Sequence, residues 1–193
     1  DFILLIGCNP RLEATIVNYR IRKAVNSGCN VFSIGDPGDQ NYYYKILGNN
    51  ISILDDFINN KILESKLLNE AKNPAIIVGE SALTSNISGY VISSVKNLLK
   101  KINKLNGFNI LHQFASNVGS LKLGLQSKNL KKMYNSELLY LVNCDEVSIN
   151  KNDDQFIIYQ GSHGGENSTI ADVVLPSSSY TEKNGSFVNL GGR

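Results

Sequence analysis

The 193-residue chain has no tryptophan, one methionine, two histidines and three cysteines. Cys8, Cys29 and Cys144 stand far apart, and no two of them form a CxxC pair. Three isolated thiols are too few for a disulfide framework and for the four thiolates of an ordinary iron–sulfur cluster. We therefore expect three buried, inert thiols in a reducing compartment.

Histidine is equally sparse, and the sequence predicts no metal site and no catalytic residue. Neither His112 nor His163 has a second His or Cys at ligand spacing. His112 ends an apolar run, which favours the core or a sheet edge. His163 lies in a glycine-rich loop, where close approach to a ligand and a solvated turn both stay open. The neighbouring Arg11 is expected to lower the pKa of Cys8, but no base accompanies this thiol in the sequence.

Long apolar runs are missing too. None approaches the roughly 20 residues of a membrane span, and the N-terminus has no signal or transit pattern. The formal net charge is +2, and the basic residues at 100–101 and 131–132 are pairs rather than a stripe. Nucleic-acid binding is therefore not expected. Because the chain begins at Asp1 without a methionine, we expect it to be cut from a longer precursor or subunit.

Nucleotide-binding motifs are absent or incomplete. Gly7-Cys8-Asn9-Pro10 stands where a dinucleotide fold would carry GxGxxG, and only the first glycine is present. Pro10 removes one of the amides that a phosphate would use. GxxxxGK[ST] occurs nowhere, which excludes a P-loop. A free-standing nucleotide-binding module is therefore the weakest of the functions considered.

Short apolar runs alternate with amphipathic segments almost throughout. The runs predict strands at 2–6, 31–34, 75–78, 108–111, 138–142, 156–159 and 173–175. Helices are expected at 10–26, from a cap at Asp55 or Asp56 to 73, at 86–103 and at 116–125, with a helical turn over 42–48. This alternation predicts an α/β fold, a doubly wound, mostly parallel sheet flanked by helices, with residues 1–193 forming one domain or part of one.

The first predicted helix has a partial apolar stripe, formed by Leu12, Ile16, Tyr19 or Arg20, and Val25, which we expect to face the core. Ligands in this architecture bind beyond the carboxyl ends of the strands. The loops to inspect are therefore 7–11, 35–39, 79–81, 112–116, 143–146 and 160–166.

With these segments laid out, the chain resembles a known family: the large iron–sulfur subunit of respiratory complex I, called the 75 kDa subunit in mitochondria and the G subunit in bacteria. The similar part is its molybdopterin-oxidoreductase-like domain. The matching segments follow the family's order: DFILLIGCNPRLEATIVNYRIRKA at 1–24, VFSIGDPGD at 31–39, PAIIVGESAL at 74–83, NILHQFASNVGSLKLG at 109–124, FIIYQGSHGG at 156–165 and IADVVLPSSSYTEKNGSFVNLGGR at 170–193.

The resemblance implies a domain that has lost its cofactor. In the family the cluster-binding cysteines lie in an N-terminal region that this chain does not contain, so iron–sulfur clusters, FMN and NADH are expected elsewhere in the complex. Gly191-Gly192-Arg193 departs from the family's usual Glu-Gly-Arg, which removes a carboxylate. The vestigial pterin-facing candidates, by match to cofactor-bearing relatives, are Gly7, Asn9, Thr181, Glu182, Asn184 and Arg193.

The resemblance favours a non-catalytic structural and assembly domain of the peripheral arm of NADH:ubiquinone oxidoreductase. Its expected partners are other peripheral-arm subunits, above all the cluster-bearing part of the same subunit, on the matrix side of the mitochondrial inner membrane. A bacterial cytoplasmic face fits the residues almost as well. Thr181, Glu182 and Lys183 are expected to hold loop against loop, Glu182 and Lys183 being possible ion-pair partners of Arg193. The segment 42–44 and Leu190 are expected to need partners, so that the chain alone is not stable.

The alternative is a fragment of a molybdopterin-dependent oxidoreductase that still binds a pterin or nucleotide. It predicts that the loops at 7–11, 112–116 and 181–193 converge on one deep pocket lined with donors. The sequence leaves open whether the chain is encoded separately or is part of a longer subunit.

Overall fold

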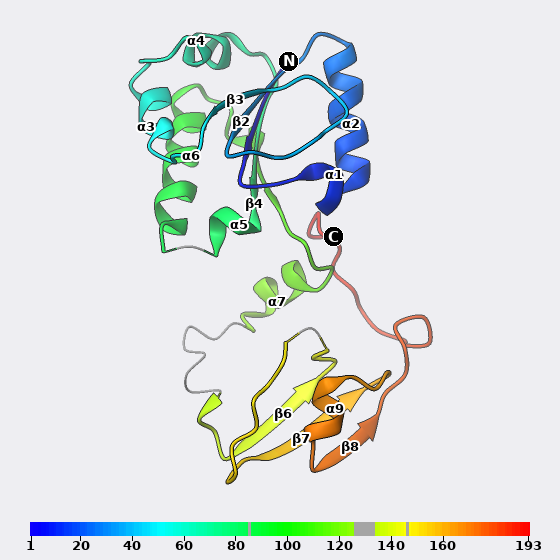
Figure 1. The fold of residues 1–193 in the computed structure, drawn as a ribbon. Coiled ribbons are helices and arrows are strands. Elements are labelled where there is room, and N and C mark those ends of the chain that lie inside the picture. The colour runs from blue at the N-terminus through cyan, green and yellow to red at the C-terminus, as the bar shows by residue number, and fades with distance from the viewer. Residues whose placement is uncertain (85, 126–133, 146) are drawn as a thin grey trace. The chain divides into compact units, whose positions relative to one another are not determined.

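The computed structural model describes residues 1–84, 86–125, 134–145 and 147–193. The chain folds into two compact units, Asp1–Asn117 and Val118–Arg193. Each unit contains a sheet in which every strand pair is parallel (Figure 1). The predicted α/β class with mostly parallel strands is confirmed, although the described strands form two sheets rather than one. That residues 1–193 are a single domain stays a prediction.

The first unit is built on a five-stranded sheet of order β3-β2-β1-β4-β5. Its strands are β1 (Phe2–Ile6), β2 (Asn30–Ile34), β3 (Lys45–Gly48), β4 (Pro74–Gly79) and β5 (Phe108–Leu111). Its helices are α1 (Pro10–Glu13), α2 (Thr15–Asn26), α3 (Ile53–Ile58), α4 (Leu63–Glu70), α5 (Glu80–Leu83) and α6 (Ser88–Lys101), followed by the 3₁₀ turn η1 (Leu105–Gly107).

Both faces of this sheet are covered, as its continuous apolar strands predict. Alternate residues of β1 point to opposite faces. Phe2, Leu4 and Ile6 pack with α3, α4 and α6, whereas Ile3 and Leu5 pack with α2 on the other side (Figure 1). The sheet is therefore doubly wound, and the loops beyond the carboxyl ends of its strands are where this architecture binds ligands.

The structure departs from the local sequence pattern in three places. The turn expected over 42–48 contains strand β3, because its backbone pairs with β2. The helix expected from residue 10 breaks at Ala14, whose φ of −155° leaves the helical region. The helix expected from Asp55 or Asp56 to residue 73 is split into α3 and α4 at Asn60, whose φ is 54°. Asp55 and Asp56 lie in the first turn of α3 rather than at its cap.

Glu64 is a buried carboxylate of α4, and its Oε1 accepts a hydrogen bond from Lys45 Nζ at 2.6 Å. This hydrogen bond holds the pKa of Glu64 below its usual 4.5. A lowered folded-state pKa stabilises the fold above the unfolded pKa, and the contribution is lost as the pH falls through the folded value. We expect Glu64→Gln to lower the free energy of unfolding by about 1 kcal/mol at pH 7. In urea titrations the difference from wild type should shrink below about pH 4.5. A constant difference down to pH 3 would contradict this assignment.

The second unit holds a three-stranded sheet, β6 (Leu138–Val142), β7 (Phe156–Gly161) and β8 (Val173–Pro176), in that order. α9 (Glu166–Ile170) connects β7 with β8, and α7 (Asn117–Leu123) precedes the sheet in sequence. Leu139, Leu141, Ile157 and Tyr159 form its core. The intervening side chains of β6 and the first residue of β7 are exposed. One face of this sheet is therefore packed, and the other is largely open.

No helix among the described residues is long and apolar enough to span a membrane. Of the basic pairs noted above, the one at 100–101 lies in the last turn of α6. The pair at 131–132 lies outside the described residues.

Candidate functional site

The candidate site lies at the carboxyl ends of the strands in the first unit. In the order β3-β2-β1-β4-β5 the winding reverses between β1 and β4, and folds of this type bind ligands beside that point. A cavity of about 170 Å³ opens there, lined by residues 7–9, 13, 33–37 and 81. Small-molecule pockets commonly measure roughly 300–1,000 Å³, so this cavity is small for a nucleotide or a pterin.

Two glycines close the crevice between β1 and β4. A Cβ atom at Gly79 would lie 2.5 Å from the Cβ of Cys8, 2.9 Å from its Cα, and closer still to the carbonyl oxygen of Gly7. Gly7 itself has φ +55°, and its carbonyl accepts a hydrogen bond from the Ser81 hydroxyl. The loops that follow β1 and β4 are therefore in close contact at Gly79, and most of the residues that line the cavity belong to the loops after β1 and β2.

Asn9 caps α1, as the Asn-Pro sequence predicts. Its Oδ1 accepts from the backbone N–H of Leu12 at 3.2 Å, and its own backbone N–H donates to Glu13 Oε1 at 2.9 Å. Pro10 has no N–H to offer. The first amides of a helix ordinarily need an outside acceptor, and here the chain supplies its own.

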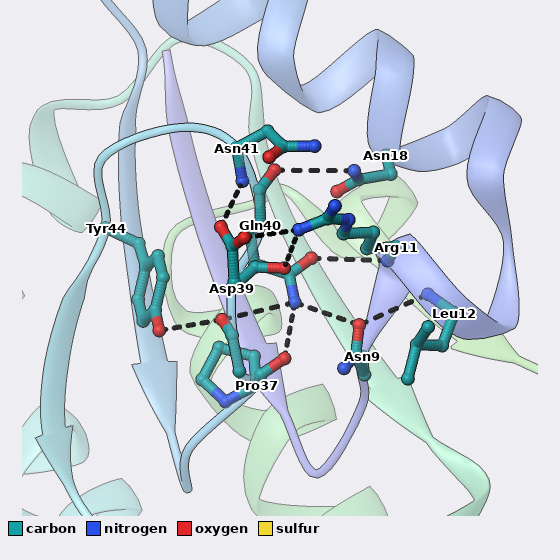
Figure 2. Close-up of polar contacts among 10 residues, drawn as sticks. Asn9, Arg11, Leu12, Asn18, Pro37, Asp39, Gln40, Asn41 and Tyr44 are labelled. Carbon is teal, nitrogen blue, oxygen red and sulfur yellow. Dashed lines mark hydrogen bonds and ion pairs between the residues drawn. The ribbon is translucent and has the colours of Figure 1, made fainter.

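Gln40 takes the remaining amide of the first turn. This residue, in the loop between β2 and β3, is 1% exposed. Its Oε1 accepts from the backbone N–H of Arg11 at 3.2 Å, and its Nε2 donates to Asn9 Oδ1 at 2.9 Å and to the carbonyl of Pro37 (Figure 2). Gln40 is not among the site residues predicted from the sequence, because a lone amide belongs to no motif. The only signal was its position next to the inspected loop 35–39.

The charges around the cavity disfavour an anion. Glu13 and Asp36 are among its lining residues, which include no Lys or Arg. The guanidinium of Arg11 instead pairs with Asp39 at 2.5 Å (Figure 2). The backbone N–H of Asn41 and then Arg11 lower the pKa of Asp39. A pyrophosphate at this position would meet carboxylates and a helix start whose donors are already used.

The whole chain, residues 1–193, matches the model of the molybdopterin oxidoreductase family. The chain belongs to this family. It is 42% identical to the NADH-ubiquinone oxidoreductase 75 kDa subunit of Reclinomonas americana and 39% identical to the G subunits of NADH-quinone oxidoreductase from Rickettsia bellii and Rickettsia prowazekii. These alignments cover all of this chain but only 29–30% of each relative. The resemblance predicted from the sequence is confirmed.

The first unit does not fit the pyrophosphate of a pterin cofactor. The amides at the start of α1 are taken, the cavity is small, and its wall carries two carboxylates. The described residues also hold no group of three or more His, Cys, Asp or Glu side chains suited to a metal ion.

Cys8, the thiol nearest to this site, is buried and donates from Sγ to the carbonyl of Ile77 at 3.7 Å. Burial, and then the charge of Glu13, raise its pKa to about 12. The expectation that Arg11 lowers this pKa is wrong, because the Arg11 guanidinium pairs with Asp39.

Alkylation measures this directly. At pH 8.5 we expect iodoacetamide to modify Cys8 on the order of 10³-fold more slowly in the folded chain than in 6 M urea, because the thiolate is the reactive form. Peptide mass mapping reads each cysteine separately, and Cys29, also buried, serves as the matched control. Rapid labelling of Cys8 in the folded chain would contradict this assignment.

The two histidines have structural surroundings. His112 directly follows β5, an edge strand of the sheet, which agrees with the predicted core or sheet-edge position. Its Nδ1 lies 3.1 Å from Glu80 Oε1, which also accepts from Asn117. His163 is exposed, and its Nδ1 lies 3.0 Å from the hydroxyl of its neighbour Ser162. Of the two interpretations left open for His163, the solvated turn fits this geometry.

The contacts of the closing stretch, residues 181–193, differ from those that we expected. The Thr181 hydroxyl lies 2.9 Å from that of Ser179 within the same loop. No ion pair joins Glu182 or Lys183 to Arg193 among the residues that the structure describes. Lys122 Nζ instead donates to the carbonyl of Gly192 at 2.6 Å, which ties α7 to the end of the chain.

The six vestigial candidates are divided between the two units. Gly7 and Asn9 belong to the first, and Thr181, Glu182, Asn184 and Arg193 belong to the second. A common pterin-facing surface therefore stays a prediction.

Proposed function

We propose that this chain is a structural domain of the hydrophilic arm of an NADH:quinone oxidoreductase, which supports electron transfer from NADH to quinone and carries no electrons itself. The relatives are subunits of that enzyme by name. The observation that carries the structural role is the start of α1, whose amides are bonded to Glu13, Gln40 and Asn9 of the chain itself.

A phosphate-bearing cofactor has definite requirements of its binding site. Such a group binds at a helix start through free N–H donors and positive potential. This site presents satisfied donors, two carboxylates and a closed crevice. Those features rigidify the carboxyl edge of the sheet, which serves a domain whose task is to hold neighbours in place.

The proposal names neighbouring parts of the complex as the partners of this chain and places the cofactors in those parts. The neighbours are the cluster-bearing part of the same subunit and other peripheral-arm subunits, on the matrix side of the mitochondrial inner membrane or the equivalent bacterial face. Iron–sulfur clusters, FMN and NADH belong to those parts of the assembly. This chain holds none of them.

Cofactor analysis of the native complex tests the proposal. The chain is separated from its complex, and its metals are measured by mass spectrometry. Bound pterin is converted by acid oxidation to its fluorescent form. We expect no stoichiometric molybdenum, tungsten, iron, flavin or pterin with this chain, while iron and FMN are recovered with the other subunits. One molybdenum or one pterin per chain would overturn the proposal.

The alternative, a molybdopterin-dependent oxidoreductase that still binds a pterin or nucleotide, is favoured by the family match over the whole chain. Binding of inorganic pyrophosphate distinguishes this alternative from the structural role. The alternative expects a saturable rise in the melting temperature of the complex beyond that in sulfate of equal ionic strength. The structural role expects the two salts to act alike.

Substitutions in the closing stretch test the assembly role. Glu182 and Asn184 are exposed, so Glu182→Ala and Asn184→Ala should leave the stability of the chain nearly unchanged. We expect less assembled complex on native gels and unchanged turnover per assembled complex. Asp153→Ala, at another exposed position, is the control and should assemble normally. Normal assembly with reduced turnover would argue for a direct part in chemistry.

A further inference from the structure

The outer side of α2 carries apolar residues that the sequence pattern places in the core. Ile16 and Tyr19, expected in the core, are 73% and 61% exposed. Asn18 and Ile21 are buried in their place. One reason is that Asn18 Nδ2 donates to the backbone carbonyl of Gln40 at 3.4 Å, which turns that side of α2 toward the loop between β2 and β3 (Figure 2).

Four residues of α2 form one outward stripe: Ile16, Tyr19, Arg20 and Lys23 are all exposed. Their spacing of three and four residues places them on the same helix face. We call them the α2 outer stripe. It therefore combines two large apolar side chains with two cations.

The charge of α2 is one-sided. Arg20, Arg22 and Lys23 are its charged residues, and its sequence TIVNYRIRKAVN contains no Asp or Glu. Within the part of the chain that the structure describes, none of the three cations is in an ion pair with a carboxylate. The α2 outer stripe thus offers apolar contact and unneutralised positive charge together.

We propose that the α2 outer stripe docks another subunit of the assembly, through an apolar depression bordered by Asp or Glu side chains. This inference rests on the proposed function for the existence of the assembly. Ile16 and Tyr19 enter the depression, and Arg20 and Lys23 meet the carboxylates around it. Exposed aromatic and aliphatic anchors beside Arg are typical of interface centres, and complementary charge sets their register.

Charge also selects among the possible occupants. A second copy bound through the same stripe would bring Arg20 and Lys23 of both copies into one interface, and α2 offers no carboxylate to pair with them. A lipid surface is disfavoured, because a helix lying in a membrane interface buries a broad apolar face. The inward face of α2 is already packed on the sheet, which leaves only Ile16 and Tyr19 outward.

Carbodiimide cross-linking of the native complex tests the inference, because it joins a lysine amine to a carboxylate in direct contact. We expect Lys23 to be linked to an Asp or Glu of another subunit, as identified by peptide mass mapping. Lys66, an exposed lysine of α4, is the matched control and should be linked at least tenfold less to other subunits. Lys23→Arg keeps the charge without the amine, so the linked peptide should vanish while the complex persists.

Two surface variants make the result decisive. Ile16→Asp and Tyr19→Ser should each lower the Lys23 cross-link at least tenfold while the melting temperature of the chain stays unchanged. The inference is overturned if Lys23 links only within its own chain or to a second copy, or if neither variant alters the cross-link. Flotation of the chain with phosphatidylcholine–phosphatidylserine vesicles, lost in Ile16→Ser, would also overturn it.

The proposed function fails on a different observation, the absence of this chain from isolated NADH:quinone oxidoreductase. In that case the same cross-link, run on whichever assembly contains the chain, still decides the inference. If the chain is present in the isolated enzyme but Lys23 is not linked to another subunit, the proposed function stands, and the inference that the α2 outer stripe docks another subunit fails.

Discussion

Gly79→Ala is expected to lower the free energy of unfolding by about 3 kcal/mol, at the upper end of the usual cost of overpacking. Gly79 has φ −84° and ψ 165°, a conformation open to any residue, so backbone strain contributes nothing. The cost is steric, because the new methyl group would meet the backbone of Gly7 and Cys8. Neither neighbour can yield without separating β4 from β1, the central strand of the sheet. Urea unfolding followed by circular dichroism measures the loss.

Gly89→Ala is the matched control. Gly89 lies in α6, and a Cβ there meets nothing within 4 Å. The same substitution should therefore stabilise the chain by about 0.5–1 kcal/mol through helix propensity. If Gly79→Ala unfolds at the same urea concentration as wild type, the loops after β1 and β4 are not in contact, and a ligand crevice is open there.

The strands of the first unit follow from sequence for a simple physical reason. A strand buried on both faces is apolar at every position, so residues 2–6 and 75–78 stand out without an alignment. The loops at the carboxyl ends follow from the topology. What the sequence conceals is which loops touch, because that depends on Gly7 and Gly79, which are 72 positions apart in a chain with sixteen glycines. A search for GxGxxG considers only one of the two loops.

The α2 outer stripe and β3 show the same limit. A period of three to four residues marks an apolar face, but it does not say whether the sheet or another chain covers it. In α2 the sheet-facing side includes the polar Asn18, which has a partner in the loop after β2. In β3 the decisive contact is pairing with β2, which local propensity does not contain.

Gln40→Ala is expected to lower the free energy of unfolding by about 3 kcal/mol, as much as Gly79→Ala. The reason is the opposite one, because Gln40→Ala removes atoms and Gly79→Ala adds them. The truncation deprives the Arg11 N–H and the Pro37 carbonyl of their side-chain partner and leaves a void where the Gln40 side chain is buried. Hydrogen exchange supplies a second readout, because the Arg11 amide should exchange faster in the variant than in wild type.

Asp39→Asn separates the role of Gln40 from that of the neighbouring ion pair. The side chains of Arg11 and Asp39 are 40% and 76% exposed, and ion pairs exposed to water contribute little to stability. The variant should therefore melt close to wild type and leave the exchange of the Arg11 amide unchanged. The reverse result, with Asp39→Asn unstable and Gln40→Ala unaffected, would place the strength of this edge in the exposed ion pair. The start of α1 would then keep a donor for a ligand, and the structural role proposed for the chain would lose its main support.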